Sequence, residues 1–157
     1  LGVEALNKRQ RAKGLKLLQV ACNKKYKNSC LLIESERHYD ENIKKCSEKN
    51  NFNSCYLVGM KLMRDGDHKK GSISLKHACD NNIFAACMEA GTFFASINRI
   101  ELAKSFYKKS CDHDDYKACF NLKYLSADNV AGRKKLNKLY DKCLENNESA
   151  CSELRNP

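Results

Sequence analysis

Ten cysteines, spaced in couples, constrain the fold of this 157-residue chain more than any other feature. Seven residues separate the two members of each couple, or eight in the second couple. The couples are Cys22 and Cys30, Cys46 and Cys55, Cys79 and Cys87, Cys111 and Cys119, and Cys143 and Cys151. From Cys79 onward the first members recur every 32 residues. A fixed period of about 20–50 residues is typical of solenoids and related repeat proteins.

Other positions repeat with the cysteines. A Ser or Ala precedes each second cysteine, and Gly59 and Gly91 each lie four residues after one. The interval from Cys22 to Cys46 is only 24 residues, one or two helical turns shorter than the others. We expect a single domain, 1–157, with repeats at about 1–27, 28–51, 52–83, 84–115 and 116–147 and a terminal segment at 148–157.

Apolar residues before each first cysteine recur at the spacing of one helix face, as at Leu15, Leu18 and Cys22. Shorter apolar runs follow the second cysteines. Such runs could also be buried strands, but richness in Ala, Leu, Lys and Glu and the position of the single proline, Pro157, favour helices. The sequence therefore predicts an all-α fold, a right-handed α/α solenoid of five helix pairs with a final stub helix at Ser149–Leu154.

The couples also predict a disulfide pattern. The first cysteine of a couple ends one helix and the second opens the next, and a tight turn between antiparallel helices brings such positions together. A disulfide needs Cα atoms about 4.4–6.8 Å apart. We expect sequential pairing, although ten cysteines formally allow hundreds of connectivities. Each closed loop contributes about 2–3 kcal/mol on the chain-entropy model.

Five disulfides favour an oxidising compartment, the bacterial periplasm or the outside of the cell, over the mitochondrial intermembrane space. No stretch approaches the roughly 20 apolar residues of a membrane span. Because the chain begins at Leu1, we expect it to be trimmed or processed.

The net charge of +10 is concentrated in residues 1–28, which hold eight basic residues and one acidic residue. This end could attract an acidic protein, an anionic lipid surface or nucleic acid. We favour a solvated helix, and the expected compartment argues against nucleic acid.

Three segments resemble the SEL-1-like repeats, relatives of the tetratricopeptide repeat, and within them the cysteine-rich Helicobacter proteins. They are KKCSEKNNFNSCYLVG (44–59), KHACDNNIFAACMEAG (76–91) and KKSCDHDDYKACFNL (108–122). The resemblance implies a solenoid whose disulfides join neighbouring helices, and it covers almost the whole chain. The 32-residue unit departs from the usual 36 of that subclass, so the curvature and the partner do not transfer directly.

The sequence offers weak evidence for chemistry. Zinc sites use closer cysteine spacings with clustered histidine, and haem attachment needs C-x-x-C-H, so we expect no metal and no cofactor. Members of the resembling subclass are described as penicillin-binding proteins or weak β-lactamases, and Ser105-Phe106-Tyr107-Lys108 matches S-x-x-K. The K-T-G and S-D-N elements are missing, so we interpret this match as a solvated helix face.

A binding surface is the favoured alternative. In tetratricopeptide-like solenoids the first helix of each pair lines a concave face that receives a partner. Offsets of three, four and seven residues from the second cysteine are expected in the core, as at Val58, Gly59 and Leu62. Seven other residues are expected to line the groove: Tyr56, Met60, Met63, Met88, Thr92, Phe120 and Tyr124.

The sequence therefore predicts a non-enzymatic, monomeric protein-interaction module that binds a protein or peptide, with an acidic partner suiting its charge. Its two specific forms are a host-interacting secreted factor and a periplasmic immunity protein against a toxin. The alternatives are a penicillin-binding or weakly β-lactamase-like protein and an assembly factor of the mitochondrial intermembrane space.

Overall fold

The computed structural model describes residues 2–25 and 27–156, with the side chains of residues 10–25, 29–34, 36–48 and 50–156. Over these residues the regular structure is entirely helical: α1 (Gly2–Asn23), α2 (Lys27–Lys49), α3 (Phe52–Arg64), α4 (His68–Asp80), α5 (Phe84–Ser96), α6 (Ile100–Cys111), α7 (Tyr116–Ser126), α8 (Val130–Leu144) and α9 (Glu148–Arg155). Consecutive helices pack on one another. The prediction of an all-α chain is confirmed, and the arrangement is consistent with a helical solenoid.

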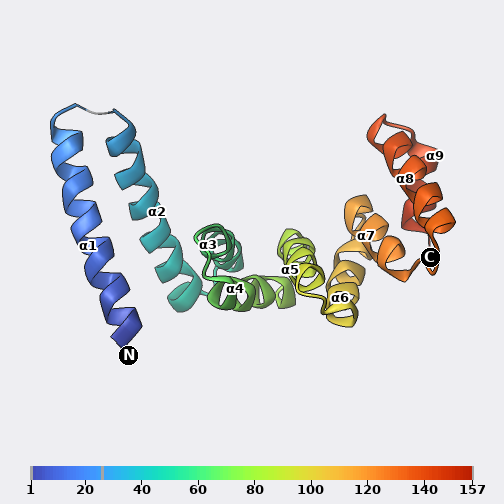
Figure 1. Ribbon diagram of the computed structural model, residues 1–157, viewed down its shortest axis with the longest axis horizontal. Coiled ribbons are helices and arrows are strands. Elements are labelled where there is room, and N and C mark those ends of the chain that lie inside the picture. The colour runs from blue at the N-terminus through green and yellow to red at the C-terminus, as the bar shows by residue number, and fades with distance from the viewer. Residues whose placement is uncertain (1, 26, 157) are drawn as a thin grey trace.

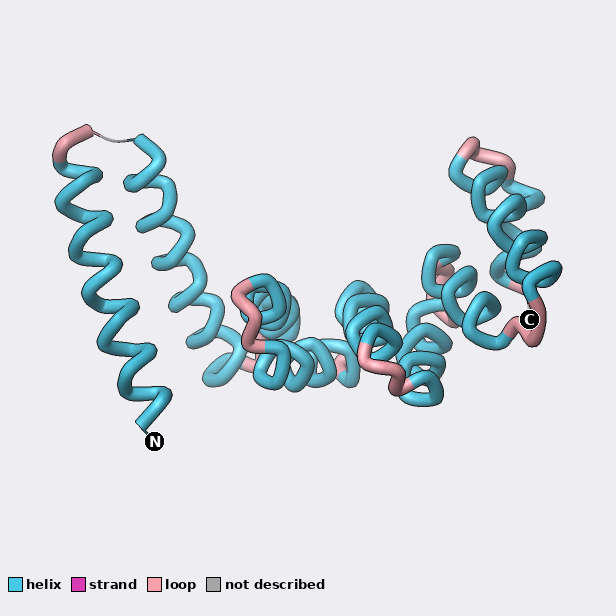
Figure 2. Tube along the Cα trace, viewed as in Figure 1, coloured by secondary structure: helices cyan, strands magenta, loops and turns pink. Residues whose placement is uncertain are grey.

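The helices form an open curve (Figure 1). Helices α3, α5 and α7 line its inner side, while α4 and α6 lie along the outer side. The hairpin of α1 and α2 stands at one end and the pair α8 and α9 at the other, and short loops join the helices (Figure 2). The inner side is therefore formed by the first helix of each pair.

The expected five helix pairs are not all present. Three of the expected units, 52–83, 84–115 and 116–147, each contain two helices, but 1–27 and 28–51 each contain only one. Fifteen residues lie between Cys30 and Cys46, against 23 between Cys55 and Cys79. The shorter segment leaves too little chain for a loop between two helices of the length found in the later units, so α2 continues through it.

The turn inside each later couple follows one pattern. The third residue after the first cysteine has a left-handed backbone, as at Asn82 with φ of 66°. Its N–H donates to the Cys79 carbonyl, and the Ile83 N–H donates to the Ala78 carbonyl, which is the Schellman end of a helix. Asparagine and aspartate tolerate this conformation better than other residues with a side chain. The same positive φ occurs at Asp114 and Asn146.

Side-chain caps begin most of the following helices. The Asn51, Asp115 and Asn147 side chains accept hydrogen bonds from backbone N–H groups of the first turns of α3, α7 and α9. Such a cap satisfies a donor that the helix itself leaves unpaired. The polar residues between the two cysteines of a couple therefore end one helix and start the next.

The structure joins the two cysteines of every couple by a disulfide, with Cα–Cα distances of 4.6–4.8 Å. Each disulfide ties the end of one helix to the first turn of the next. Four of the cysteines have no exposed surface: Cys55, Cys79, Cys87 and Cys119. Each disulfide from Cys46–Cys55 onward thus has at least one buried cysteine and is not a surface addition.

The last disulfide joins Cys143 of α8 to Cys151 of α9, with the two Cα atoms 4.7 Å apart. Cys143 is buried, whereas Cys151 is half-buried and packs against the cluster around Leu154. The helix that carries Cys151 extends one residue beyond each end of the expected stub helix at Ser149–Leu154. The terminal helix is therefore present and slightly longer than the sequence indicated.

The interior consists of clusters arranged along the curve. One surrounds Leu75 between α3, α4 and α5; a second surrounds Tyr107; and a third surrounds Leu154 at the end of the chain. No described side chain of α1 or α2 is buried to the same degree. Each cluster is built by neighbouring helices, as expected where stability arises from contacts between adjacent repeats.

Candidate binding groove between α3 and α5

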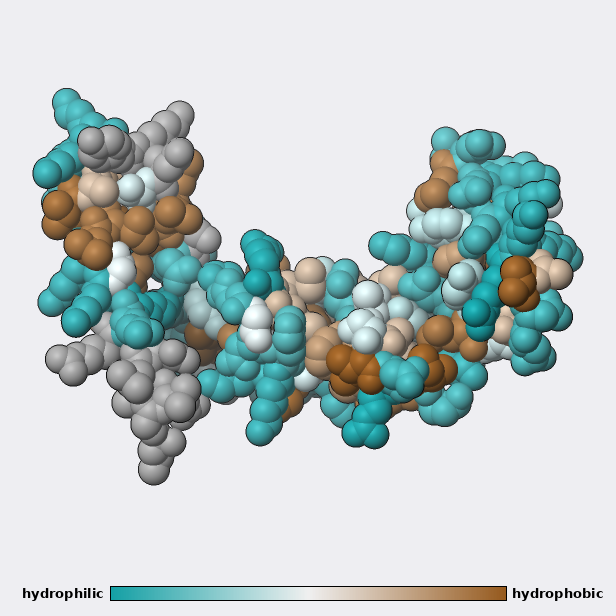
Figure 3. Space-filling view, viewed as in Figure 1, coloured by the Kyte–Doolittle hydropathy of each residue, from teal (hydrophilic) through white to brown (hydrophobic). Residues whose placement is uncertain are grey.

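A cavity of about 540 Å³ lies between α3 and α5, the two helices that line the middle of the inner side. Its size falls within the range of about 300–1,000 Å³ that is usual for ligand sites. It includes three of the residues that the sequence placed in a groove: Met60, Met63 and Thr92. Figure 3 shows both hydrophilic and hydrophobic residues on the surface of the middle part of the curve.

The cavity has apolar walls. Met60 and Met63 come from α3, Phe93 comes from α5, and the fully buried Leu75 of α4 contributes to the lining. The centre of the Phe93 ring lies 5.9 Å from that of the His68 ring, and the two ring planes are inclined by 27°. Methionine side chains are flexible and polarizable, so this surface can adapt to apolar groups of different shape.

Charged groups of both signs are at the edge of the cavity. Arg64 of α3 contributes a guanidinium, His68 of α4 an imidazole and Glu89 of α5 a carboxylate. Burial raises the pKa of the Tyr56 hydroxyl, and the nearby charge of Glu89 raises it further. The site therefore combines an apolar centre with polar groups that can orient a bound chain.

Thr92 is held in place by two hydrogen bonds. Its hydroxyl donates to the Met88 carbonyl at 3.0 Å and accepts from the Tyr107 hydroxyl at 3.2 Å. Burial raises the pKa of Tyr107, which remains a donor at neutral pH. This pair connects the groove side of α5 to the outer helix α6.

Two residues expected in the groove lie elsewhere. Met88 is only 8% exposed and packs among Ala103, Tyr107 and Ala118, so it belongs to the interior. Phe120 stacks on Tyr140 of α8 with ring centres 4.4 Å apart. Both residues directly follow a second cysteine, and this position is turned toward the neighbouring helices.

The remaining expected groove residues are half-buried. Tyr56 packs against the cluster around Leu75. Tyr124, on α7, lies 5.6 Å from Phe120 and 5.3 Å from the guanidinium of Arg133. Neither residue lines the cavity, although Tyr56 lies on the same helix as Met60.

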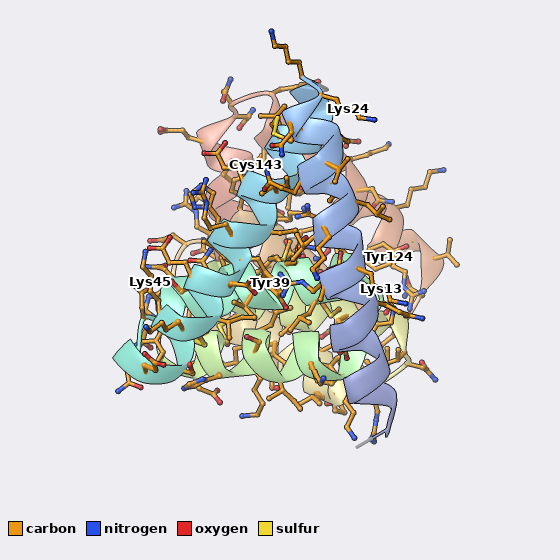
Figure 4. The ribbon with its side chains drawn as sticks, turned by 90° about the vertical axis from the view of Figure 1, so that its left-hand side faces the viewer. Lys13, Lys24, Tyr39, Lys45, Tyr124 and Cys143 are labelled. Carbon is orange, nitrogen blue, oxygen red and sulfur yellow. A yellow bond between two sulfur atoms is a disulfide. The ribbon has the colours of Figure 1, made fainter. Side chains whose placement is uncertain are left out.

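A charged network, which the sequence did not indicate, joins the hairpin to α3. Glu36 pairs with Arg11 of α1 at 2.7 Å and with Lys61 of α3 at 3.2 Å. The Tyr39 ring has the Arg11 and Lys61 cations 5.6 and 5.4 Å from its centre, and Figure 4 shows Tyr39 between the hairpin helices. Burial alone would raise the pKa of Glu36, but hydrogen bonds from Arg11 and Lys61 outweigh it and hold that pKa below 4.5.

One group of potential metal ligands occurs among the described residues. The ligand atoms of Cys46, Cys55 and His77 lie within 4.8 Å of one another. Both sulfurs belong to the Cys46–Cys55 disulfide, whereas a metal ligand is a thiolate. In this oxidised form the group offers the His77 ring nitrogen alone.

The S-x-x-K match lies on α6, along the outer side of the curve. The Ser105 hydroxyl donates to the Leu102 carbonyl at 2.7 Å, and the Lys108 ammonium pairs with Asp112 at 2.9 Å. Ser105 and Lys108 thus each have another partner. The β-lactamase-like alternative stays a sequence-based prediction.

Among the described residues, no helix combines the length and the apolar character needed to cross a bilayer. Comparison of the chain with protein-family models, with curated proteins and with solved structures gave no match. The five disulfides fit an oxidising location, extracellular or periplasmic.

Proposed function

We propose that this chain is a non-enzymatic interaction module, periplasmic or secreted, that binds a segment of a partner protein in the cavity between α3 and α5. The observation that carries the proposal is the cavity itself, which has apolar walls and a charged edge and lies between two inner helices. The resemblance to SEL-1-like repeats supports the same role. Two specific forms of it are a host-interacting factor and an immunity protein that blocks a toxin.

The chemistry of the cavity defines the segment. Met60, Met63 and Phe93 suit a large apolar side chain inserted toward Leu75. Arg64 and Glu89 at the edge suit polar or charged groups on either side of that anchor. Interfaces of this kind depend on a few buried apolar anchors surrounded by a polar rim. An extended or helical segment with one central apolar residue therefore fits best.

Selection from a phage-displayed random peptide library on the oxidised chain tests this proposal. We expect the enriched peptides to share a large apolar residue and to bind the Phe93→Glu variant at least about tenfold more weakly. Arg64→Glu, at the exposed edge, is a second variant that should weaken binding without affecting folding. The matched control is Ile73→Glu, because Ile73 is 62% exposed on α4 and does not line the cavity.

The proposal fails if no peptide is enriched. It also fails if the selected peptides bind Phe93→Glu and Arg64→Glu as tightly as the unmodified chain. Circular dichroism of each variant checks that its helices are retained.

A further inference from the structure

One face of α1 has no partner within the part of the chain that the structure describes. It carries exposed residues spaced as one side of a helix, Lys13, Lys16, Leu17 and Val20, and Lys24 continues this side in the turn that follows α1; these five residues are here called the outer α1 row. Leu17 is 72% exposed and Val20 is 54% exposed. These two side chains lie three residues apart and form a short exposed apolar strip bordered by lysines.

The opposite side of α1 is already occupied. Arg11 pairs with Glu36 of α2, and Leu15 and Leu18 line the hollows between the two helices of the hairpin. Figure 4 shows Lys13 and Lys24 on the side of α1 that points away from α2. In Figure 3 apolar residues also gather over the upper part of this hairpin. The row is therefore a free side of the helix and not part of the hairpin contact.

The charge around the row is entirely positive. Residues 10–25 contain five cations and no acidic residue. Arg11 is paired with Glu36 and Asp40, whereas no described carboxylate pairs with Lys13, Lys16 or Lys24. A second copy of this chain would bring like charges together at the row, so self-association there is unfavourable.

We propose that the outer α1 row docks an acidic amphipathic helix of a partner protein, on a surface separate from the α3–α5 cavity. Helices pack through side chains three and four residues apart, which is the spacing of this row. Leu17 and Val20 contact apolar side chains of the partner helix. The three lysines pair with its carboxylates, which speeds encounter and excludes basic partners.

The row suits a helix better than a lipid surface. Helices that lie on membranes separate a wide apolar sector from a cationic sector. In α1 the cations are interleaved with the two apolar residues along one row. If Leu17 and Val20 entered the acyl chains, the stems of the neighbouring lysines would be drawn in with them and their ammonium groups would have to extend back to the headgroups, which limits how deeply the row can insert.

Fluorescence anisotropy on the full oxidised chain tests the proposal with a labelled synthetic helix that has leucines on one side and glutamates on the other. We expect binding that weakens as salt is raised, and no binding of a peptide in which lysines replace the glutamates. Reversing the three charges, by Lys13→Glu, Lys16→Glu and Lys24→Glu, should weaken binding at least about tenfold. Leu17→Gln with Val20→Gln should weaken it by removing the apolar contact.

The matched control reverses the same number of charges on another exposed helix, by Lys134→Glu, Lys138→Glu and Lys142→Glu on α8. These variants should retain binding. Equal losses from the α1 and α8 reversals would indicate a general field effect and overturn the proposal. Binding to phosphatidylcholine–phosphatidylglycerol vesicles without binding to the acidic helix would also overturn it, in favour of a lipid surface.

Discussion

Gly91 of α5 lies directly against the ring of Tyr107 on α6, so closely that a Cβ atom at position 91 would stand 2.7 Å from a ring carbon. Gly59 has the same relationship to Leu75 one repeat earlier, at 2.8 Å. In the next repeat the equivalent residue is Lys123, and α8 packs far less closely on α7. The missing glycine thus accompanies the change of direction of the chain at α8 (Figure 1).

Lys123 has a different contact instead. Its ammonium group donates to the carbonyl of Glu153 at 2.9 Å and to that of Asn156, at the C-terminal end of α9. A cation at this end of a helix satisfies carbonyls that lack partners within the helix. The side chain that stands in place of the packing glycine therefore holds the last helix.

The glycine contact predicts the effect of adding one methyl group. Gly91→Ala should lower the free energy of unfolding by about 1–3 kcal/mol, because the new Cβ overlaps the Tyr107 ring. Gly14→Ala is the control, since no atom lies within 4 Å of its new Cβ, and it should raise stability by about 0.5–1 kcal/mol. Urea unfolding measures both. Equal effects of the two changes would contradict the close packing of α5 on α6.

The network around Glu36 predicts a pH dependence. Its pKa in the folded chain is below the ordinary 4.5, so its contribution to stability is complete above about pH 5. That contribution is lost as the pH falls through the lowered pKa. Glu36→Gln should therefore destabilise the chain at pH 7, and the difference should shrink by about pH 3. Urea midpoints at both pH values measure it.

The control for this change is Glu101→Gln, because the Glu101 side chain is 87% exposed and has only a pairing with Lys104 on its own helix. It should alter stability by less than about 0.5 kcal/mol at either pH. If the stability difference between Glu36→Gln and the unmodified chain stays constant with pH, the ionised Glu36 carboxylate does not stabilise the contacts with Arg11 and Lys61.

The turn that follows α1 predicts a stabilising substitution. Lys25 has a φ of 68° at the position where later turns have Asn82, Asp114 and Asn146. Lys25→Asn should raise stability by about 0.5–1 kcal/mol, since asparagine adopts this backbone more readily. Lys24→Asn changes the charge equally, but Lys24 lies outside the left-handed region, so it should give no gain. Thermal unfolding compares the two.

The disulfides differ in burial, and this predicts different costs of removal. Replacing both Cys22 and Cys30 by alanine should cost about 2–3 kcal/mol, mainly through the entropy of the unfolded chain. Replacing Cys79 and Cys87 should cost more, because both are fully buried and their loss also leaves a cavity. Urea unfolding gives the two values. Peptide mapping without reduction should recover the five sequential pairs. Any other pairing would contradict the disulfides that join the end of one helix to the start of the next.

The contacts of Ser105 on the outer helix α6 predict that it does not react with penicillins. Fluorescent penicillin should not label the chain covalently, because the Ser105 hydroxyl is bonded to a backbone carbonyl and Lys108 is paired with Asp112. Gel fluorescence measures labelling, with Ser105→Ala as the control. Labelling that disappears in Ser105→Ala would instead establish the penicillin-binding alternative.

Much of the fold could be predicted because its determinants are local. The cysteine period and the polar turn residues act within a few residues of where they stand, and Gly59 and Gly91 act on the next helix along the chain, through Leu75 and Tyr107. Between Cys30 and Cys46 the sequence shows only a shorter interval, which does not by itself distinguish one continuous helix from a shortened pair. The Arg11–Glu36 pair spans 25 residues and lacks any local signal.

The groove was predicted only in part because it depends on how each helix is rotated against its neighbours. Positions five and eight after the second cysteine, Met60 and Met63, line the cavity, while the first position, as at Met88, turns inward. Phe93 was missed. Consecutive phenylalanines point about 100° apart on a helix, so Phe94 packs against the cluster around Leu75 while Phe93 lines the cavity.

The position of each disulfide also determines what a protease can separate. A cut between Cys79 and Cys87 leaves both products covalently joined through that disulfide. A cut in the loop at 65–67 or at 97–99 lies between couples and releases a fragment without any reducing agent. From α2 to α9, a protease that cuts a loop within a couple therefore leaves the two products joined by the disulfide of that couple. The loops between couples, such as 65–67 and 97–99, determine the sizes of the fragments that a protease can release.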